Sequence, residues 1–217
     1  MTQPPNRVLQ PGESAPDFTL HRVQDDRTVS LSAYRGRSAL LLGLFPGLYC
    51  PFCRRAVAQM AVSAGKLKPL GIESLAVVGT ELDNARFYFK FRPTPIAVAA
   101  DPQLTTHRSY GVPRPEPTPE MLKAAEAVRI NPTGELPYPM PVPAAAEALT
   151  KLEGYEMTET DLREAEWQFT QLKGQFLIDR DGVIRWVNIE CGKEGLAGLG
   201  KFPSYEELLT AAQVTSR

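Results

Sequence analysis

The chain has 217 residues, 43% of them apolar and 23% charged, which is the composition of an ordinary globular protein. Its 24 basic and 25 acidic residues leave a formal net charge of −1, so no positive field attracts nucleic acid or an anionic membrane. The longest apolar run, residues 39–45, is far shorter than the roughly 20 residues that span a bilayer, and residues 1–20 contain no apolar signal segment. We therefore expect a cytoplasmic protein without nucleic-acid or membrane partners.

The N-terminal half of the chain predicts a β-hairpin followed by alternating strands and helices. Residues 18–20 and 28–31 are short strand candidates on either side of an Asp25-Asp26 turn, and together they form an N-terminal extension. The segments that follow are predicted as strand, helix, strand, helix, strand and short helix: residues 39–45, 51–66, 72–78, 82–90, 96–100 and 101–111. Alternation of this kind predicts a parallel α/β sheet.

Residues 112–173 interrupt this alternation. Nine of the chain's 20 prolines lie between Pro113 and Pro143, and proline neither continues a helix nor donates to a sheet. We expect an irregular, Pro-rich insertion that carries short helices, one of them at residues 119–130. The whole chain, residues 1–217, is then one domain that contains this insertion.

A second helix of this segment is expected at residues 158–173, and two strands and a final helix are expected after it, at residues 175–178, 183–189 and 204–214. Thr158 and Asp161 approximate a capping arrangement at the start of the 158–173 helix. The apolar residues of that helix are expected to supply its packing surface: Leu162, Trp167, Phe169 and Leu172. The turn from Asp179 to Gly182 predicts a hairpin, because Asp-Gly tolerates positive φ.

Two cysteines in the sequence Cys50-Pro51-Phe52-Cys53 stand where a predicted strand gives way to a predicted helix. A thiol at a helix N-terminus faces unpaired backbone N–H groups, which stabilise its thiolate. The proline suits the first helical position, and either Arg54 or the next residue, Arg55, lends positive potential if its side chain folds back. We expect a redox-active pair, held as a dithiol between turnovers in a reducing cytosol.

The cysteine pair has two alternative interpretations. Two incidental thiols at a helix start are one alternative, and metal binding is another. A closed zinc site needs four ligands, and the remaining candidates, Cys191, His21 and His107, form no second close pair, so we expect no metal.

The remaining motifs have structural explanations. Cys191 is expected to be a packed thiol, with disulfide resolution as the minority reading. Residues 195–201 resemble a phosphate loop, but Phe202 occupies the Ser or Thr position, so we expect a loop that borders the active site instead. His21 and His107 are expected at the surface or at helix ends. The aromatic residues of 87–91 are expected to pack on the sheet, with contact to another subunit as the alternative.

Five segments of the chain form a recognisable set: Gly12-x-x-Ala15-Pro16-Asp17-Phe18-x-Leu20, Leu31-x-x-Tyr34-Arg35-Gly36 and residues 45–54, 101–111 and 176–185. In these segments the chain resembles the alkyl hydroperoxide reductase and thiol-specific antioxidant (AhpC/TSA) family of peroxiredoxin-like proteins. The resemblance implies a thioredoxin-like α/β fold with a central mixed β-sheet flanked by helices, and no bound cofactor. It also implies a hydroperoxide or disulfide substrate, a thioredoxin- or glutathione-like reductant, and a homodimer.

The resemblance offers two alignments of the cysteine pair. Peroxiredoxins share a Pro-x-x-x-Thr-x-x-Cys loop, and Pro46 lies seven residues before Cys53, which would make Cys53 the peroxidatic residue. Thioredoxins and glutaredoxins instead use the first cysteine, here Cys50, as the nucleophile. Where thioredoxins carry a cis-proline and peroxiredoxins an arginine, this chain has Lys173, which would supply a positive charge near the thiolate.

We predict a thiol-dependent oxidoreductase in which Cys50 attacks and Cys53 closes the disulfide. Reduction of hydroperoxides is the first expectation, and exchange with protein or small-molecule disulfides is the alternative. A third hypothesis is a redox-switched interaction protein that docks a partner through residues 113–173.

Overall fold

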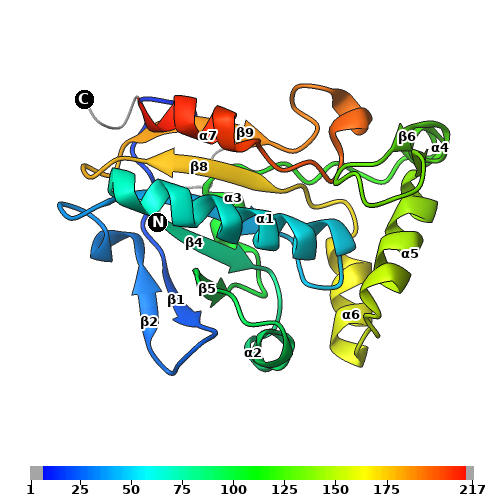
Figure 1. Ribbon diagram of the computed structural model, residues 1–217, viewed down its shortest axis with the longest axis horizontal. Coiled ribbons are helices and arrows are strands. Elements are labelled where there is room, and N and C mark those ends of the chain that lie inside the picture. The colour runs from blue at the N-terminus through cyan, green and yellow to red at the C-terminus, as the bar shows by residue number, and fades with distance from the viewer. Residues whose placement is uncertain (1–6, 214–217) are drawn as a thin grey trace.

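Strand β3 (Ala39–Phe45) lies inside a seven-stranded sheet in the computed structural model, which describes residues 7–213 (Figure 1). The strand order is β2-β1-β5-β4-β3-β8-β9. All seven residues of β3 are buried, because both faces of the sheet are covered at this point, and an uninterrupted apolar run suits that environment. β3 pairs in parallel with β4 (Ile72–Val78), which pairs in parallel with β5 (Ala97–Ala100).

Antiparallel strands complete the sheet on both sides. β8 (Gly174–Ile178) pairs with β3 and with β9 (Ile184–Ile189), and the turn between β8 and β9 includes Gly182 at a φ of +83°. On the other side, β1 (Thr19–Arg22) pairs with β5 and with β2 (Thr28–Ser30). Every strand expected from the sequence is present. The sheet is mixed, as the family resemblance implied, and not parallel throughout.

Helices cover the two faces of the sheet unequally. α1 (Pro51–Leu67), α2 (Leu82–Phe91) and α7 (Tyr205–Ala212) pack on one face and share an apolar core with β3 and β4. The other face is covered by the N-terminal segment and by Tyr110, which follows α3 (Thr105–Ser109). Three short 3₁₀ helices occur in connections: η1 (Leu31–Ala33), η2 (Lys68–Leu70) and η3 (Gly195–Gly198).

Residues 112–173 contain more regular structure than expected. Their elements are α4 (Pro119–Ala127), β6 (Arg129–Ile130), β7 (Met140–Pro141), α5 (Val142–Glu153) and α6 (Glu159–Gln168). Neither α5 nor the two-stranded sheet was predicted, because Pro141 and Pro143 suggested an irregular chain. Proline is well suited to the first turn of a helix, and α5 begins there. The description of this segment as an insertion in one domain stays a prediction.

Helix α5 brings the segment to the cysteine motif. Figure 1 shows α5 and α6 beside the end of the molecule at which α1 begins. A small apolar cluster joins Phe52 of the motif to Ile130, Leu136, Ala145 and Leu149. The segment therefore packs directly against the start of α1.

The packing predicted for α6 is wrong. Leu162 and Phe169, expected to supply apolar surface, are 58% and 61% exposed, and the helix ends at Gln168. Its buried side chains are instead Asp161, Glu164 and Gln168. The predicted cap at the start of the helix is confirmed as a reciprocal capping box between Thr158 and Asp161.

The aromatic residues of α2 are divided between core and surface. Tyr88 and Phe89 are buried against the sheet-facing core, as expected. Phe87 and Phe91 are 58% and 62% exposed, and their rings meet edge to face with centroids 5.3 Å apart. Across residues 7–213, no helix has both the length and the apolar character needed to cross a membrane.

Candidate redox site

The dithiol motif lies at the first turn of α1. Cys50 is the N-cap residue, Pro51 occupies the first helical position, and the Cys50 carbonyl accepts hydrogen bonds from the backbone N–H groups of Cys53 and Arg54. The Cys53 N–H also lies 3.4 Å from the Cys50 sulfur, which can accept it. Cys50 is half-buried and Cys53 is fully buried, and both thiols are free. Cys50 is therefore the more accessible of the two.

The two thiols have different acidities. A hydrogen bond with the Cys53 thiol is the main cause that lowers the pKa of Cys50 from 9.0 to about 7, with burial opposing it and the Lys173 ammonium adding to it. The pKa of Cys53 is raised, because burial and the neighbouring Cys50 both disfavour a second thiolate. When the pair ionises near neutral pH, the negative charge is therefore on Cys50, and Cys53 holds a proton.

Lys173 forms a buried ion pair with Glu190 beside the thiols. The Lys173 Nζ lies 2.7 Å from Glu190 Oε1, and their side chains are 1% and 8% exposed. Glu190 also accepts hydrogen bonds from the backbone N–H groups of Lys173 and Gly200. Burial alone would lower the pKa of Lys173, but Glu190 and the two cysteines outweigh it, so the pKa is raised and the ammonium stays charged.

Glu190 was missed by the sequence analysis, since a glutamate after a strand carries no motif. Its position depends on the β8–β9 register, which shifts at an irregularity between Leu177 and Ile178. Beyond the shift Gly174 pairs with Ile189, which brings Glu190 opposite Lys173. A one-residue slip would turn the side chains of one strand to the opposite face.

The Arg54 side chain folds back onto the loop that precedes Cys50. It is 1% exposed, and its Nε lies 2.7 Å from Glu153 Oε2 in α5. Its Nη1 donates to the carbonyls of Leu48 and Tyr49, 2.7 and 3.1 Å away. Arg54 is therefore paired with Glu153 and fixes the loop before Cys50, and its contribution to the potential at the thiolate stays a prediction.

Pro46 lies at the start of that loop, directly after β3. A Cβ at Gly79 would fall 2.0 Å from the Pro46 carbonyl oxygen, so only glycine permits the two backbones to approach this closely. Pro46 therefore helps to define the path of the loop.

Helix α6 holds the connection of residues 79–81, which in turn contacts the loop before Cys50. The Leu48 N–H donates to Thr80 Oγ1 at 2.9 Å, and Gln168 Nε2 donates to the Gly79 carbonyl at 2.6 Å. Glu164 Oε1 accepts the Glu81 N–H at 2.7 Å. Burial is the main cause that raises the pKa of Glu164 to about 7. None of these polar contacts was anticipated.

The minor candidates are placed as follows. Cys191 is half-buried at a φ of +64°, and burial followed by the Glu190 carboxylate raises its pKa to about 11. The loop of residues 195–201 borders the motif as expected, because a Cβ at Gly200 would lie 2.7 Å from the Phe52 ring. His21 is exposed on β1.

The surface placement expected for His107 is wrong, although the residue does lie in the last turn of the short helix α3. His107 is fully buried, and burial lowers its pKa to about 3. In the part of the chain that the structure describes, no group of three or more His, Cys, Asp or Glu side chains could hold a metal ion.

The model described as the AhpC/TSA family matches residues 11–187. Peroxiredoxin Q of Oryza sativa subsp. japonica is 30% identical over 102 residues, which is 47% of this chain and 46% of the relative. The thiol-disulfide oxidoreductase ResA of Halalkalibacterium halodurans is 31% identical over 130 residues, 58% of this chain and 71% of the relative. The chain thus spans about half the length of the peroxiredoxin Q relatives it matches.

Two solved structures are similar over nearly the whole chain. The peroxidoxin BcpB of Mycobacterium tuberculosis has a TM-score of 0.57 at 13% identity, covering 96% of this chain and 97% of the other. The reduced 2-Cys peroxiredoxin of Plasmodium vivax has a TM-score of 0.57 at 14% identity, covering 96% and 81%. At this identity the likeness concerns the fold alone, and it confirms the thioredoxin-like architecture.

Proposed function

The chain belongs to the AhpC/TSA family, and from this premise we propose that it is a thiol-dependent oxidoreductase that cycles Cys50 and Cys53 between dithiol and disulfide. The observation that carries the proposal is the difference between the two thiols: an accessible Cys50 with a pKa lowered to about 7 beside a buried, protonated Cys53. This arrangement favours Cys50 as the attacking residue over the alternative alignment that begins at Pro46. Attack by a thiolate with a pKa near ambient pH is efficient.

The first substrate class is a hydroperoxide. The Cys50 thiolate attacks one peroxide oxygen, the S–O bond forms, the O–O bond breaks, and the leaving oxygen takes a proton to depart as water or an alcohol. Cys53 then attacks the sulfenic sulfur of Cys50, and the proton it loses leaves with the hydroxyl as water. The resulting disulfide accepts two electrons from a thioredoxin- or glutathione-like thiol, which becomes oxidised.

Exchange with disulfides is the second candidate. The similarity to ResA, named a thiol-disulfide oxidoreductase, favours it and covers more of that relative's length than the peroxiredoxin Q match does. In this reaction the Cys50 thiolate attacks a substrate sulfur, and Cys53 resolves the mixed disulfide. The cytoplasmic location, the homodimer and the redox-switched interaction all stay predictions.

A stopped-flow experiment separates these candidates. Fully reduced protein is mixed with hydrogen peroxide, and oxidation is followed in the wild type, Cys50→Ser, Cys53→Ser and, as a control, Cys191→Ser. We expect oxidation orders of magnitude faster than that of a free thiol, lost in Cys50→Ser and retained in Cys191→Ser. A rate equal to that of a free thiol would exclude hydrogen peroxide and favour disulfide exchange. Loss only in Cys53→Ser would reverse the assigned roles.

The positioning role of Lys173 has its own test. Replacing Lys173 by Met removes the ammonium that lowers the pKa of Cys50 and leaves the Glu190 charge, which raises it. The pH dependence of iodoacetamide alkylation of Cys50 should therefore shift upward, while Lys193→Met at the surface should not change it. An unchanged titration in Lys173→Met would remove this residue from the proposed site.

A further inference from the structure

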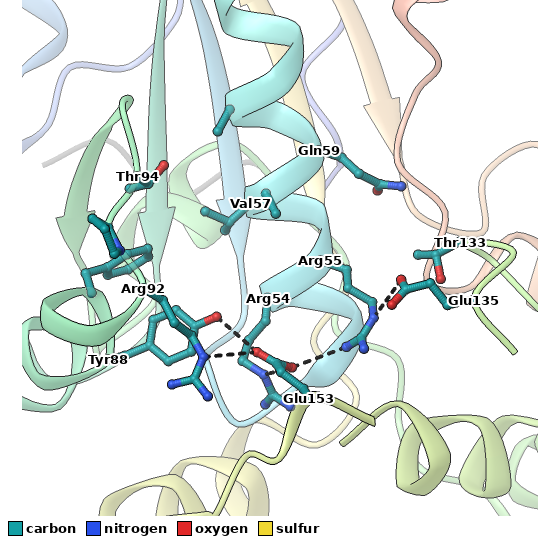
Figure 2. A pocket seen from close by; sticks show the side chains of 14 residues that line it. Arg54, Arg55, Val57, Gln59, Tyr88, Arg92, Thr94, Thr133, Glu135 and Glu153 are labelled. Carbon is teal, nitrogen blue, oxygen red and sulfur yellow. Dashed lines mark hydrogen bonds and ion pairs between the residues drawn. The ribbon is translucent and has the colours of Figure 1, made fainter. Parts of the chain in front are cut away.

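A second candidate site lies on the side of α1 that faces α2 and α5. Figure 2 shows an open groove there, whose volume is about 520 Å³. It is lined by side chains from α1, from the end of α2, and from the segment that contains Thr133 and Glu153. Neither thiol lines this groove, so it is distinct from the dithiol site.

Three arginines share two carboxylates in this groove. Glu153 lies 2.7 Å from Arg54, 3.2 Å from Arg55 and 3.6 Å from Arg92, as Figure 2 shows, and Glu135 lies 2.9 Å from Arg55. With three positive and two negative charges, the lining residues carry one uncompensated positive charge. An anion is the ligand class that this excess favours.

Arg92 is the arginine most available to a ligand. The side chains of Arg54 and Arg55 are 1% and 11% exposed and make short ion pairs, whereas that of Arg92 is 37% exposed and makes only the longest one. The Arg92 guanidinium also stacks over the rings of Tyr88 and Tyr155, which holds it in place. A guanidinium fixed in this way is preorganised to bind a carboxylate with two parallel hydrogen bonds.

Other polar atoms of the groove have no hydrogen-bond partner among the described residues. Among the described residues, Arg54 Nη2, Gln59 Oε1 and Thr94 Oγ1 are buried and make no hydrogen bond. Buried polar groups in native proteins are almost always paired with protein, water or ligand. The lining also includes apolar side chains of α1 and α2, among them Val57, Ala61 and Phe89. The lining therefore combines a charged end with an apolar wall.

We propose that this groove binds a small organic monocarboxylate. Its carboxylate is held by the Arg92 guanidinium, and its apolar part packs on the wall that includes Val57, Ala61 and Phe89. Neither thiol is part of this site, and it does not depend on which reaction they perform.

The test uses isothermal titration calorimetry on the full-length reduced protein at low ionic strength. The probes are benzoate and benzamide, which share a ring and differ in charge. We expect benzoate to bind and benzamide to bind at least tenfold more weakly. Arg92→Gln should weaken benzoate binding at least tenfold, whereas Lys90→Gln, the same charge change outside the groove, should not.

A second variant guards against a merely structural effect of Arg92. Arg92→Lys keeps the positive charge but lacks the planar pair of donors, so it should leave the unfolding midpoint close to that of the wild type and still weaken benzoate binding several-fold. Equal affinity for benzoate and benzamide, no binding of either, or unchanged affinity in both variants would overturn the proposal. Benzoate binding retained in Cys50→Ser would separate this site from the thiol chemistry.

Discussion

Helices α1 and α6 meet the loop before Cys50 from two sides and pack by opposite chemistry. α1 buries apolar side chains such as Val57 and Met60 against the sheet. α6 buries Asp161, Glu164 and Gln168, and leaves its large apolar residues exposed. The surface against which each helix packs explains this difference in buried side chains. A sheet presents side chains, whereas α6 faces loop backbone whose N–H and C=O groups need hydrogen-bond partners.

The comparison assigns different tasks to the two interfaces. Apolar burial is non-directional and contributes stability in proportion to area. Hydrogen bonds are directional, so the α6 contacts with Gly79 and Glu81 specify the position of a neighbouring backbone. Through Thr80, which accepts the Leu48 N–H, that backbone holds the loop two residues before Cys50.

The largest expected loss of stability is at the α1 interface. Met60→Ala removes a side chain that is 0% exposed, so we expect it to lower the free energy of unfolding by about 2–5 kcal/mol. Val62→Ala on the exposed side of the same helix should change it by less than about 0.5 kcal/mol. Urea unfolding measures both. If the interfaces have separate tasks, the alkylation titration of Cys50 stays unchanged in Met60→Ala.

A smaller loss of stability is expected at the α6 interface. The Asp161 carboxylate accepts hydrogen bonds from Tyr155 Oη, the Thr158 N–H and Asn84 Nδ2. Asp161→Ala leaves these donors without their partner, which should cost about 1–3 kcal/mol. Its neighbour Leu162, 58% exposed, should tolerate alanine with a change below about 0.5 kcal/mol. A greater loss in Leu162→Ala than in Asp161→Ala would restore the apolar packing expected from the sequence.

Local sequence signals account for most of the sheet and for the placement of the dithiol. Residues 39–45 and 72–78 were predicted with the bounds they have, because a long apolar run bounded by turn residues has few alternatives. The position of the thiols at the start of α1 was also predicted from a local signal, because Pro51 marks the start of a helix.

The contacts around the motif depend on distant segments and were not predictable. Arg54 forms its ion pair with Glu153, which is 99 residues away on α5, a helix that was not predicted because prolines begin it. The partner of Lys173 depends on an irregular β8–β9 register. The packing of α6 was predicted wrongly for a third reason. Its apolar residues were expected to form the buried face, but a helix that packs against backbone buries polar side chains instead.

The subtlest expected effect is a pH dependence at α6. Burial raises the pKa of Glu164 from 4.5 to about 7, so the folded state binds a proton that the unfolded state releases between these values. The free energy of unfolding should therefore fall as pH rises from about 4.5 to about 7, and this contribution should be constant outside that window. The Glu81 hydrogen bond survives protonation, because one carboxyl oxygen still accepts.

Glu164→Gln cannot ionise and should lose this slope. The stability advantage of the variant over the wild type should grow between pH 5 and pH 8 in urea unfolding, because every other titrating group cancels in the difference. Asp161 and Glu81, the other acidic groups beside Glu164, are retained in both proteins and raise its pKa. Glu166→Gln, on the exposed side of the same helix, is the matched control. A difference that is the same at both pH values would mean that Glu164 is ionised throughout, and that α6 holds the loop with a permanent charge.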